Sequence, residues 1–374
     1  MDFTFAEEQQ MLIDSARRYL AERYSFDFRK SILRSDAGWS RAAWTDFAGL
    51  GLLSLNVSEA DGGLGAGAIE TLALGMAVGE GLVVDPVLSS AVLATRAIGQ
   101  LASAAQRQHW LPALAGGEIV AAFAHDLTAG LEPEGAVGAV PAGDDWVLNG
   151  RLPVVYHAPA ADVLVVAAST GTAAALADAL FAVPVGSAGV RLTAFRTVDD
   201  QCAAELVFDA VRVPKEGCLA RDAADGLSAV VDFGLVGLLG EALGALDRTL
   251  ALTVEYTRTR SQFGGPIARF QALQHRMVDM LMRIEQARSL VYLAATRCDS
   301  GGAEERRAAL SAAKVLVADA ARFVGQQAVQ LHGGMGVSDE MPISHYFRRL
   351  LAVELRFGSA SAHLGRFAAG MSLS

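Results

Sequence analysis

The sequence predicts an α+β protein with three consecutive domains: an N-terminal helical domain at 1–117, a middle antiparallel β domain at 118–222 and a C-terminal helical bundle at 223–374. Apolar residues recur at helical spacing in the first and last parts, whereas short apolar or alternating runs fill the middle. The chain has 374 residues, of which 52% are hydrophobic. It is therefore long enough for two or three domains and apolar enough to fold.

The N-terminal domain is predicted from one helix start and three further helical patterns. Thr4 and Glu7 form a capping-box pattern, which satisfies free backbone N–H groups at the start of a helix. Helical spacing of apolar residues continues over 42–51, 68–79 and 87–116. These patterns predict that the domain contains only helices.

The middle domain is predicted from short runs that are separated by glycine, aspartate, asparagine and proline. Such runs are typical of a small antiparallel barrel or sandwich, and we expect a β-barrel domain over 118–222. They lie at 119–124, 146–149, 163–168, 180–185, 190–195 and 204–211.

The C-terminal domain is predicted to be a four-helix, up-and-down bundle. No proline occurs between Pro214 and Pro266, so one long helix can form there. Further helical patterns span 270–296 and 303–332, and a fourth helix follows Pro342.

The composition argues against several classes of protein. The net charge of −10 disfavours general nucleic-acid binding, which needs a basic surface. The three cysteines fit neither a disulfide framework nor a zinc site, so we expect no bound metal. No signal peptide is visible at the N-terminus, and we expect a cytoplasmic protein. The apolar stretch 227–246 contains Asp232 and Glu241, which would be costly in lipid, so we expect a helix buried in protein and no membrane association.

Two motifs in the last third of the chain identify a family. The first runs from Arg260 to Gly264 and continues with Pro266 and Ile267. It also includes Phe-Gln-Ala at 270–272 and Gln-His at 274–275. The second spans Gln330 to Gly336 and reads QLHGGMG. In their order and spacing they resemble the signatures of the acyl-CoA dehydrogenase family, and the resemblance covers essentially the whole chain. It extends to the small subunits of pimeloyl-CoA dehydrogenase-like and steroid side-chain heteromeric enzymes.

The resemblance implies an FAD cofactor whose adenosine diphosphate end lies across a subunit boundary. A pyrophosphate needs a cation and close backbone donors, and an arginine and several glycines supply both. A surface arginine beside a helix-capping glycine cluster is the alternative interpretation. The residues implied to contact FAD bound mainly by a neighbouring subunit are Arg260, Phe263, Gln271, Gln330, Gly333 and Gly334.

The side of the site that meets the flavin ring departs from the family pattern. His125–Gly130 replaces the usual Thr-Glu-Pro-containing motif, and Asp126 stands where a threonine is usual. Val154 occupies the place of the aromatic residue that normally stacks on the ring. The family positions that meet the ring are Phe123, His125, Val155 and Tyr156, together with Asp126. For His125 an ordinary surface role in the β domain is the alternative.

The family reaction also needs a carboxylate that removes a proton from Cα of the acyl-CoA thioester. Phe357 stands where most members carry this glutamate, and Gly234 stands at the position that other members use. Glu241 is the remaining candidate, because glycines at 234, 237 and 244 share its helix face and would leave a groove beside it. A structural carboxylate paired with an arginine is the alternative. Glu354 resembles a salt-bridged surface residue.

These features predict a subunit of an FAD-dependent acyl-CoA dehydrogenase that desaturates the Cα–Cβ bond of an acyl-CoA and passes electrons to electron-transfer flavoprotein or a similar acceptor. The expected assembly is an α2β2 tetramer in which a larger homologous subunit supplies the base. A self-sufficient homotetramer that uses Glu241 and a catalytically inactive scaffold are the alternatives.

Overall fold

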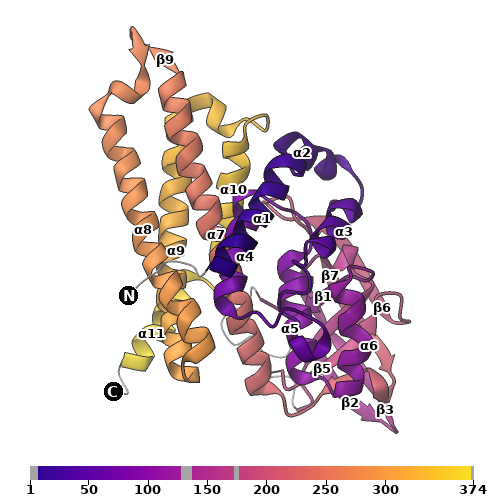
Figure 1. Cartoon of the computed structure of the whole chain (residues 1–374). Coiled ribbons are helices and arrows are strands. Elements are labelled where there is room, and N and C mark those ends of the chain that lie inside the picture. The colour runs from indigo at the N-terminus through magenta and orange to yellow at the C-terminus, as the bar shows by residue number, and fades with distance from the viewer. Residues whose placement is uncertain (1–6, 128–136, 172–176, 372–374) are drawn as a thin grey trace. The chain divides into compact units, whose positions relative to one another are not determined.

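The computed structural model describes residues 7–127, 137–171 and 177–371, and the chain divides into two compact units (Figure 1). The first unit comprises Met1–Phe26, Leu72–Val83 and Val236–Ser374. The second comprises Asp27–Thr71 and Val84–Leu235. Thr4 of the expected capping box lies outside the described residues.

The first unit is a helical bundle. Helix α9 packs against α8, α10 and α11, and α8 and α9 lie side by side over their length (Figure 1). The unit contains α1 (Glu7–Arg23), most of α4 (Ala68–Glu80), the C-terminal part of α7 (Ala224–Thr259), the β9–β10 hairpin (Ser261–Gln262 and Gly265–Pro266), η5 (Ile267–Arg269), α8 (Gln271–Ser300), α9 (Ala303–His332), η6 (Gly333–Val337), α10 (Pro342–Leu355) and α11 (Ala360–Met371).

The predicted long helices are present, but the last one is interrupted. Phe357 and Gly358 have φ angles of 58° and 88°, which a right-handed helix cannot contain. The segment after Pro342 therefore forms α10 and α11 instead of the single fourth helix that the sequence predicts.

Glycines allow α4 and α7 to approach backbone to backbone. A Cβ atom on Gly75 would lie 2.6 Å from the carbonyl oxygen of Gly237, and one on Gly79 would overlap the backbone of Glu241. A Cβ atom on Gly244 would likewise overlap the carbonyl oxygen of Met76. The prediction of a groove beside Glu241 is therefore wrong at Gly237 and Gly244, because α4 packs against α7 there.

The second unit combines short helices with two sheets. Helix η2 has π geometry and continues directly into α5. The single helical pattern predicted at 87–116 therefore forms three successive helices, η2, α5 and α6. The helical elements are α2 (Phe26–Arg34), α3 (Arg41–Gly49), η1 (Glu59–Asp61), η2 (Val87–Ala94), α5 (Thr95–Leu101), α6 (Ala104–Ala115), η3 (Ala158–Ala160) and η4 (Lys215–Gly217).

The strands form two open four-stranded sheets, in the orders β1-β4-β5-β8 and β2-β3-β7-β6. Buried side chains from both sheets make one core, as in a sandwich, the second of the two architectures that the sequence predicts. The strands are β1 (Ala121–Ala124), β2 (Val137–Ala142), β3 (Asp145–Tyr156), β4 (Val163–Ala168), β5 (Ala179–Pro184), β6 (Val190–Arg196), β7 (Cys202–Val213) and β8 (Cys218–Ala220).

One strand pair differs from the predicted antiparallel arrangement. Strand β1 pairs with β4 in parallel, with Phe123 opposite Val165. Between these two strands the chain passes through β2 and β3 of the other sheet, so β4 returns beside β1 in the same direction. The expectation of a purely antiparallel domain is wrong for this pair.

Among the described helices, α7 is long and apolar enough to cross a membrane, but 89% of its most apolar window is buried inside the protein. This burial agrees with the interpretation of 227–246 as part of a core helix.

We predict that Gly244→Ala destabilises the protein, whereas Gly365→Ala does not. The added methyl group at 244 meets the backbone of α4, and overpacking of this kind costs about 1–3 kcal/mol. Gly365 in α11 has no atom within 4 Å of an added Cβ, so alanine should stabilise its helix by about 0.5–1 kcal/mol. Urea unfolding of both variants measures the difference. Equal stability of the two variants would show that α4 and α7 are not in close contact.

Candidate functional site

The hairpin between α7 and α8 presents an aromatic side chain to the exterior. Its two-residue turn consists of Phe263 and Gly264, which both have positive φ angles of 53° and 84°. Two positive φ angles suit the twist of a hairpin but are unfavourable for phenylalanine. Arg269 donates hydrogen bonds to the carbonyl oxygens of both turn residues, and Phe263 contacts Phe270 edge to face. Phe263 is thereby held with 83% of its surface exposed.

Arg260 lies directly after α7, with its backbone fixed and its side chain exposed. Its N–H donates to Tyr256, and its carbonyl oxygen accepts from Ile267 across the hairpin, at 2.8 and 2.9 Å. In the part of the chain that the structure describes, the guanidinium makes no hydrogen bond or ion pair. Gln271, the first residue of α8, is also exposed. Both side chains are therefore available to a ligand or a neighbouring subunit.

The second motif ends α9 at the same end of the bundle. Tyr256 of α7 stacks on His332 at 4.3 Å between ring centroids and donates a hydrogen bond to its carbonyl oxygen. Gly333 has φ 61° and ψ −139°, a conformation essentially restricted to glycine. No atom lies within 4 Å of a Cβ built on Gly333 or Gly334. The glycines therefore present open backbone beside the end of α7.

These two motifs together fit the pyrophosphate end of FAD. A guanidinium without a partner among the described residues supplies a permanent positive charge, and exposed glycines allow an anion to approach the backbone. Gln330 is exposed, as is Gln271, and both add amide donors at the ends of α9 and α8. The structure brings the Arg260 and Gln330–Gly334 motifs to one end of the bundle through Tyr256 and His332.

The residues expected at the flavin ring lie in the second unit. Phe123 and Val155 are buried, and Val155 belongs to the core shared by the two sheets. His125 and Tyr156 are half-buried and follow or end strands β1 and β3. Phe123 and His125 meet edge to face, and burial lowers the pKa of His125 to about 4, although Asp126 opposes the shift. A neutral imidazole is therefore available at pH 7.

Residues 128–130 of the replaced ring motif lie outside the described residues. Contact of Phe123, His125, Val155 and Tyr156 with a flavin ring stays a prediction.

Glu241 is a buried carboxylate with two arginine partners. Its Oε1 lies 2.5 Å from Arg349, and its Oε2 lies 3.7 Å from Arg356. Arg349 also donates two hydrogen bonds to the carbonyl oxygen of Val83. This geometry favours the structural role for Glu241, because both oxygens face cations and α4 covers the neighbouring glycines. Its use as a base stays a hypothesis without support from the geometry.

The turn between α10 and α11 contains the family position of the base, here Phe357. Its side chain is 3% exposed, and His363 donates to its carbonyl oxygen at 2.8 Å. Lys314, which is completely buried in α9, donates to the carbonyl oxygens of Val353 and Arg356. Burial lowers the pKa of Lys314 to about 7. The turn is therefore closed around an apolar side chain by a buried lysine.

Lys314 is a buried residue that the family motifs do not point to, although the sequence carries a signal for it. Lys314 is the one charged residue within the small, apolar run 308–318 (AALSAAKVLVA) of a helix that packs on three neighbours. Glu354, one turn before Phe357, accepts from the backbone of Ala360 and lies 3.9 Å from Arg322. Glu354 therefore forms the expected salt bridge, and its partner is Arg322 of α9.

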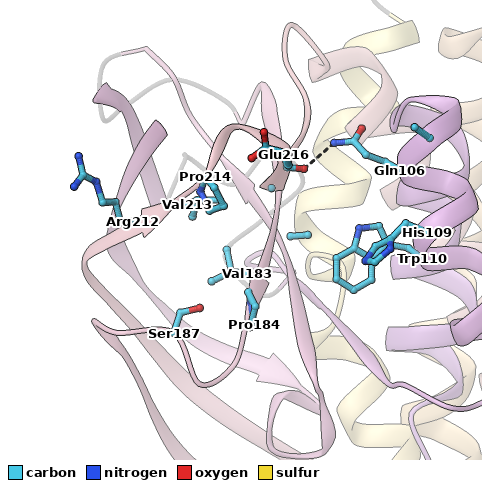
Figure 2. Close-up of a pocket in the computed structure, with 13 residues that line it drawn as sticks. Gln106, His109, Trp110, Val183, Pro184, Ser187, Arg212, Val213, Pro214 and Glu216 are labelled. Atoms are coloured by element: carbon cyan, nitrogen blue, oxygen red, sulfur yellow. Dashed lines mark hydrogen bonds between the residues drawn. The ribbon is translucent and has the colours of Figure 1, made fainter. Parts of the chain in front are cut away.

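A cavity of about 530 Å³ lies in the second unit between α6 and the ends of β5 and β7 (Figure 2). Trp110 and His109 point into it from α6, facing Val183 and Pro184. Gln106 closes one end by donating to the carbonyl oxygens of Glu216 and Cys218. None of the residues expected to contact FAD lines this cavity. Among the described residues, no group of three His, Cys, Asp or Glu side chains could hold a metal ion.

Family models and curated relatives that match this chain are all acyl-CoA dehydrogenases in the comparisons below. Residues 6–118 match the family model for the acyl-CoA dehydrogenase N-terminal domain, and residues 229–372 match that for the C-terminal domain. The chain is 30% identical to the mitochondrial short-chain specific acyl-CoA dehydrogenase of Mus musculus, over 83% of this chain and 77% of that protein. It is 29% identical to acyl-CoA dehydrogenase FadE27 of Mycobacterium tuberculosis, over 98% and 97% of the two chains.

A solved structure has the same fold over its whole length. The crystal structure of the ChsE4–ChsE5 complex from Mycobacterium tuberculosis superposes with a TM-score of 0.91 at 28% identity and covers all of both chains.

We predict that Glu241→Gln lowers the stability of the protein by about 3–5 kcal/mol, because it leaves a buried arginine without its counter-charge. Asp319→Asn is the matched control, since its ion pair with Arg283 is exposed and should contribute less than about 1 kcal/mol. Urea unfolding measures both. A Glu241→Gln protein of normal stability that no longer desaturates acyl-CoA would instead identify Glu241 as the base.

We also predict a pH-dependent contribution from Lys314. Its pKa is about 7 in the folded chain and has its ordinary value of 10.5 in the unfolded chain. Between these values the unfolded chain binds more protons, so stability rises with pH by about 1.4 kcal/mol per unit. Lys314→Met should remove this slope between pH 7.5 and 9.5, whereas Lys215→Met, at an exposed site, should keep it. Identical slopes in wild type and Lys314→Met would contradict the assignment.

Proposed function

Because this chain belongs to the acyl-CoA dehydrogenase family, we propose that it works as one subunit of a heteromeric, FAD-dependent acyl-CoA dehydrogenase. The family desaturates the Cα–Cβ bond of acyl-CoA thioesters. FAD, when bound, accepts the hydride that leaves Cβ. This chain holds the adenosine diphosphate end of the cofactor, and a homologous subunit binds the flavin ring.

The observation that carries the proposal is the state of Arg260. Its guanidinium has no partner in the described part of the chain, and it stands at the same end of the bundle as the open backbone of Gly333 and Gly334. A charged group left unpaired in this way is suited to an anionic ligand. Phe263, held outward on its hairpin, adds an apolar surface for a neighbouring subunit or for the adenine ring.

The base is assigned to the partner subunit. Glu241 faces two arginines, so a proton acceptor at this position would have to leave a buried ion pair. Phe357 cannot accept a proton, and the turn around it is closed by Lys314 and His363. Removal of the Cα proton therefore requires a carboxylate from elsewhere in the assembly.

The surface of the first unit supports association with another subunit. Val278, Leu281 and Met282 on α8 are each about half exposed, and Val337 beside the glycine motif is 73% exposed. Clustered exposed apolar residues mark contact surfaces. The similar ChsE4–ChsE5 structure is a complex of two chains. We therefore propose an α2β2 tetramer, a cytoplasmic location, electron-transfer flavoprotein or a similar protein as acceptor, and a fatty acyl or steroid side-chain substrate in β-oxidation.

The proposal predicts that the chain alone retains little FAD and that co-expression with a longer homologue brings full occupancy. Within that complex, Arg260→Ala should weaken FAD binding by about 1.5–3 kcal/mol, because a charge-assisted hydrogen bond is lost. Arg258→Ala, on the exposed end of α7, is the control and should have no effect. Flavin absorbance per protein after dialysis measures the occupancy.

Two outcomes would contradict the proposal. Stoichiometric flavin in the isolated chain would favour a self-sufficient homotetramer. Unchanged FAD retention in Arg260→Ala would mean that Arg260 is an ordinary surface residue.

A further inference from the structure

A second, smaller pocket of about 290 Å³ lies in the second unit. It shares no residue with the cavity in Figure 2 or with the residues expected to contact FAD. Arg96 is the one charged residue that lines it, in a chain whose net charge is −10. Its lining residues are Asn56, Ser58, Gly65, Ala66, Arg96, Gly99 and Gln100.

The guanidinium of Arg96 is held from one side only. Its Cζ lies over the buried Phe233 ring, 4.2 Å from the ring centre, so the guanidinium makes a cation–π contact with this ring. Its Nε is buried and has no hydrogen-bond partner, and within the described ranges Arg96 forms no ion pair. A buried donor without a partner is costly, and the edge that carries the N–H groups is the part left unsatisfied.

The backbone before Arg96 explains how this position is maintained. The π helix η2 ends at Ala94, and Thr95 donates its hydroxyl to the carbonyl oxygen of Ser90, five residues earlier, at 3.0 Å. This bond fixes the change from π to α geometry directly before Arg96. Such π segments occur frequently at functional sites.

The surroundings of the pocket favour an anion. Asp61, the acid bonded to Ser58 at the rim, already pairs with Arg107 at 3.1 Å. Asn56 uses one amide N–H for the carbonyl oxygen of Ala91 and has a second to offer. Gln100 lies one turn after Arg96 on the same helix face, as the spacing of four residues requires.

We propose that this pocket binds the oxyanion of a small molecule, a carboxylate or a phosphate, at the N–H edge of Arg96. The guanidinium edge presents donors in a fork that matches such groups. Amides of Asn56 and Gln100 supply further donors. The volume lies just below the usual range for ligand sites of about 300–1,000 Å³, which suits a small acid or phosphate rather than a nucleotide.

Thermal melting of the purified protein with potassium phosphate or potassium acetate, each matched in ionic strength with potassium chloride, tests the site. At least one of the two anions should raise the Tm of wild type above the chloride control, and the effective anion identifies the ligand chemistry. Arg96→Gln should weaken the apparent affinity about tenfold or more, because the charge-assisted pair is lost. Arg191→Gln, at an exposed ion pair, should keep the wild-type increment.

Arg260→Ala separates this site from the FAD site, because phosphate could also occupy a pyrophosphate-binding residue. The increment should persist in Arg260→Ala, whether or not that variant retains FAD. An increment that disappears in Arg260→Ala and survives in Arg96→Gln would overturn the inference.

Gln100→Glu keeps the test valid if Arg96→Gln folds poorly. This variant places a carboxylate one helical turn from Arg96, where it can occupy the guanidinium edge from within the chain. It should melt no lower than wild type in chloride and should lose the anion increment. An increment of wild-type size in both Gln100→Glu and Arg96→Gln, or none in wild type, would contradict the proposal.

Discussion

The arrangement of the first unit depends on the backbone contact between α4 and α7 and on the buried ion pair beside it. The glycines at 75, 79, 240 and 244 bring the helices together, and the carboxylate of Glu241 is then fixed by Arg349 of α10. Arg349 also binds the carbonyl oxygen of Val83, and Tyr346 binds that of Glu80, so α10 is attached to the end of α4. Leaving Glu241 without this counter-charge inside the bundle would be strongly destabilising.

This constraint determines what the chain can contribute to catalysis. Because α10 is attached to α4 and α7, the turn that follows it is fixed, and Lys314 and His363 complete its closure around Phe357. The carboxylate of Glu241 is held in a buried ion pair. The turn between α10 and α11, where most family members have a glutamate, holds Phe357 instead. By contrast, Arg260 is exposed and has no side-chain partner among the residues that the structure describes. These features support the proposal that this chain binds a cofactor phosphate and that another subunit removes the proton.

Much of this fold could be predicted from the sequence, because the long helices have strong apolar periodicity and the strands are separated by turn residues. The contacts between distant segments could not be predicted. Glycines along one helix face permit either a groove or a close helix contact, and the sequence does not say that α4 occupies the face. Likewise the partner of Glu241 lies 108 residues away at Arg349. The parallel β1–β4 pair depends on the path of the intervening chain.

The candidate site was predictable to a similar extent. The cofactor motifs are local, so the family resemblance implies roles for Arg260 and Gly333, while their common location depends on the stacking of Tyr256 on His332. The roles of Lys314 and Arg96 could not be predicted, because both depend on tertiary neighbours. Lys314 bonds to a turn 42 residues later in the chain, and Arg96 lies over the ring of Phe233.

Exchange of the Cα hydrogens of an acyl-CoA in D2O tests the central claim most directly, since it reports a base independently of net turnover. The chain alone, supplied with excess FAD, should incorporate no more deuterium at Cα than a buffer blank, whereas the complex with its larger homologue should incorporate it readily. Deuterium incorporation by the isolated chain that disappears in Glu241→Gln would contradict the account.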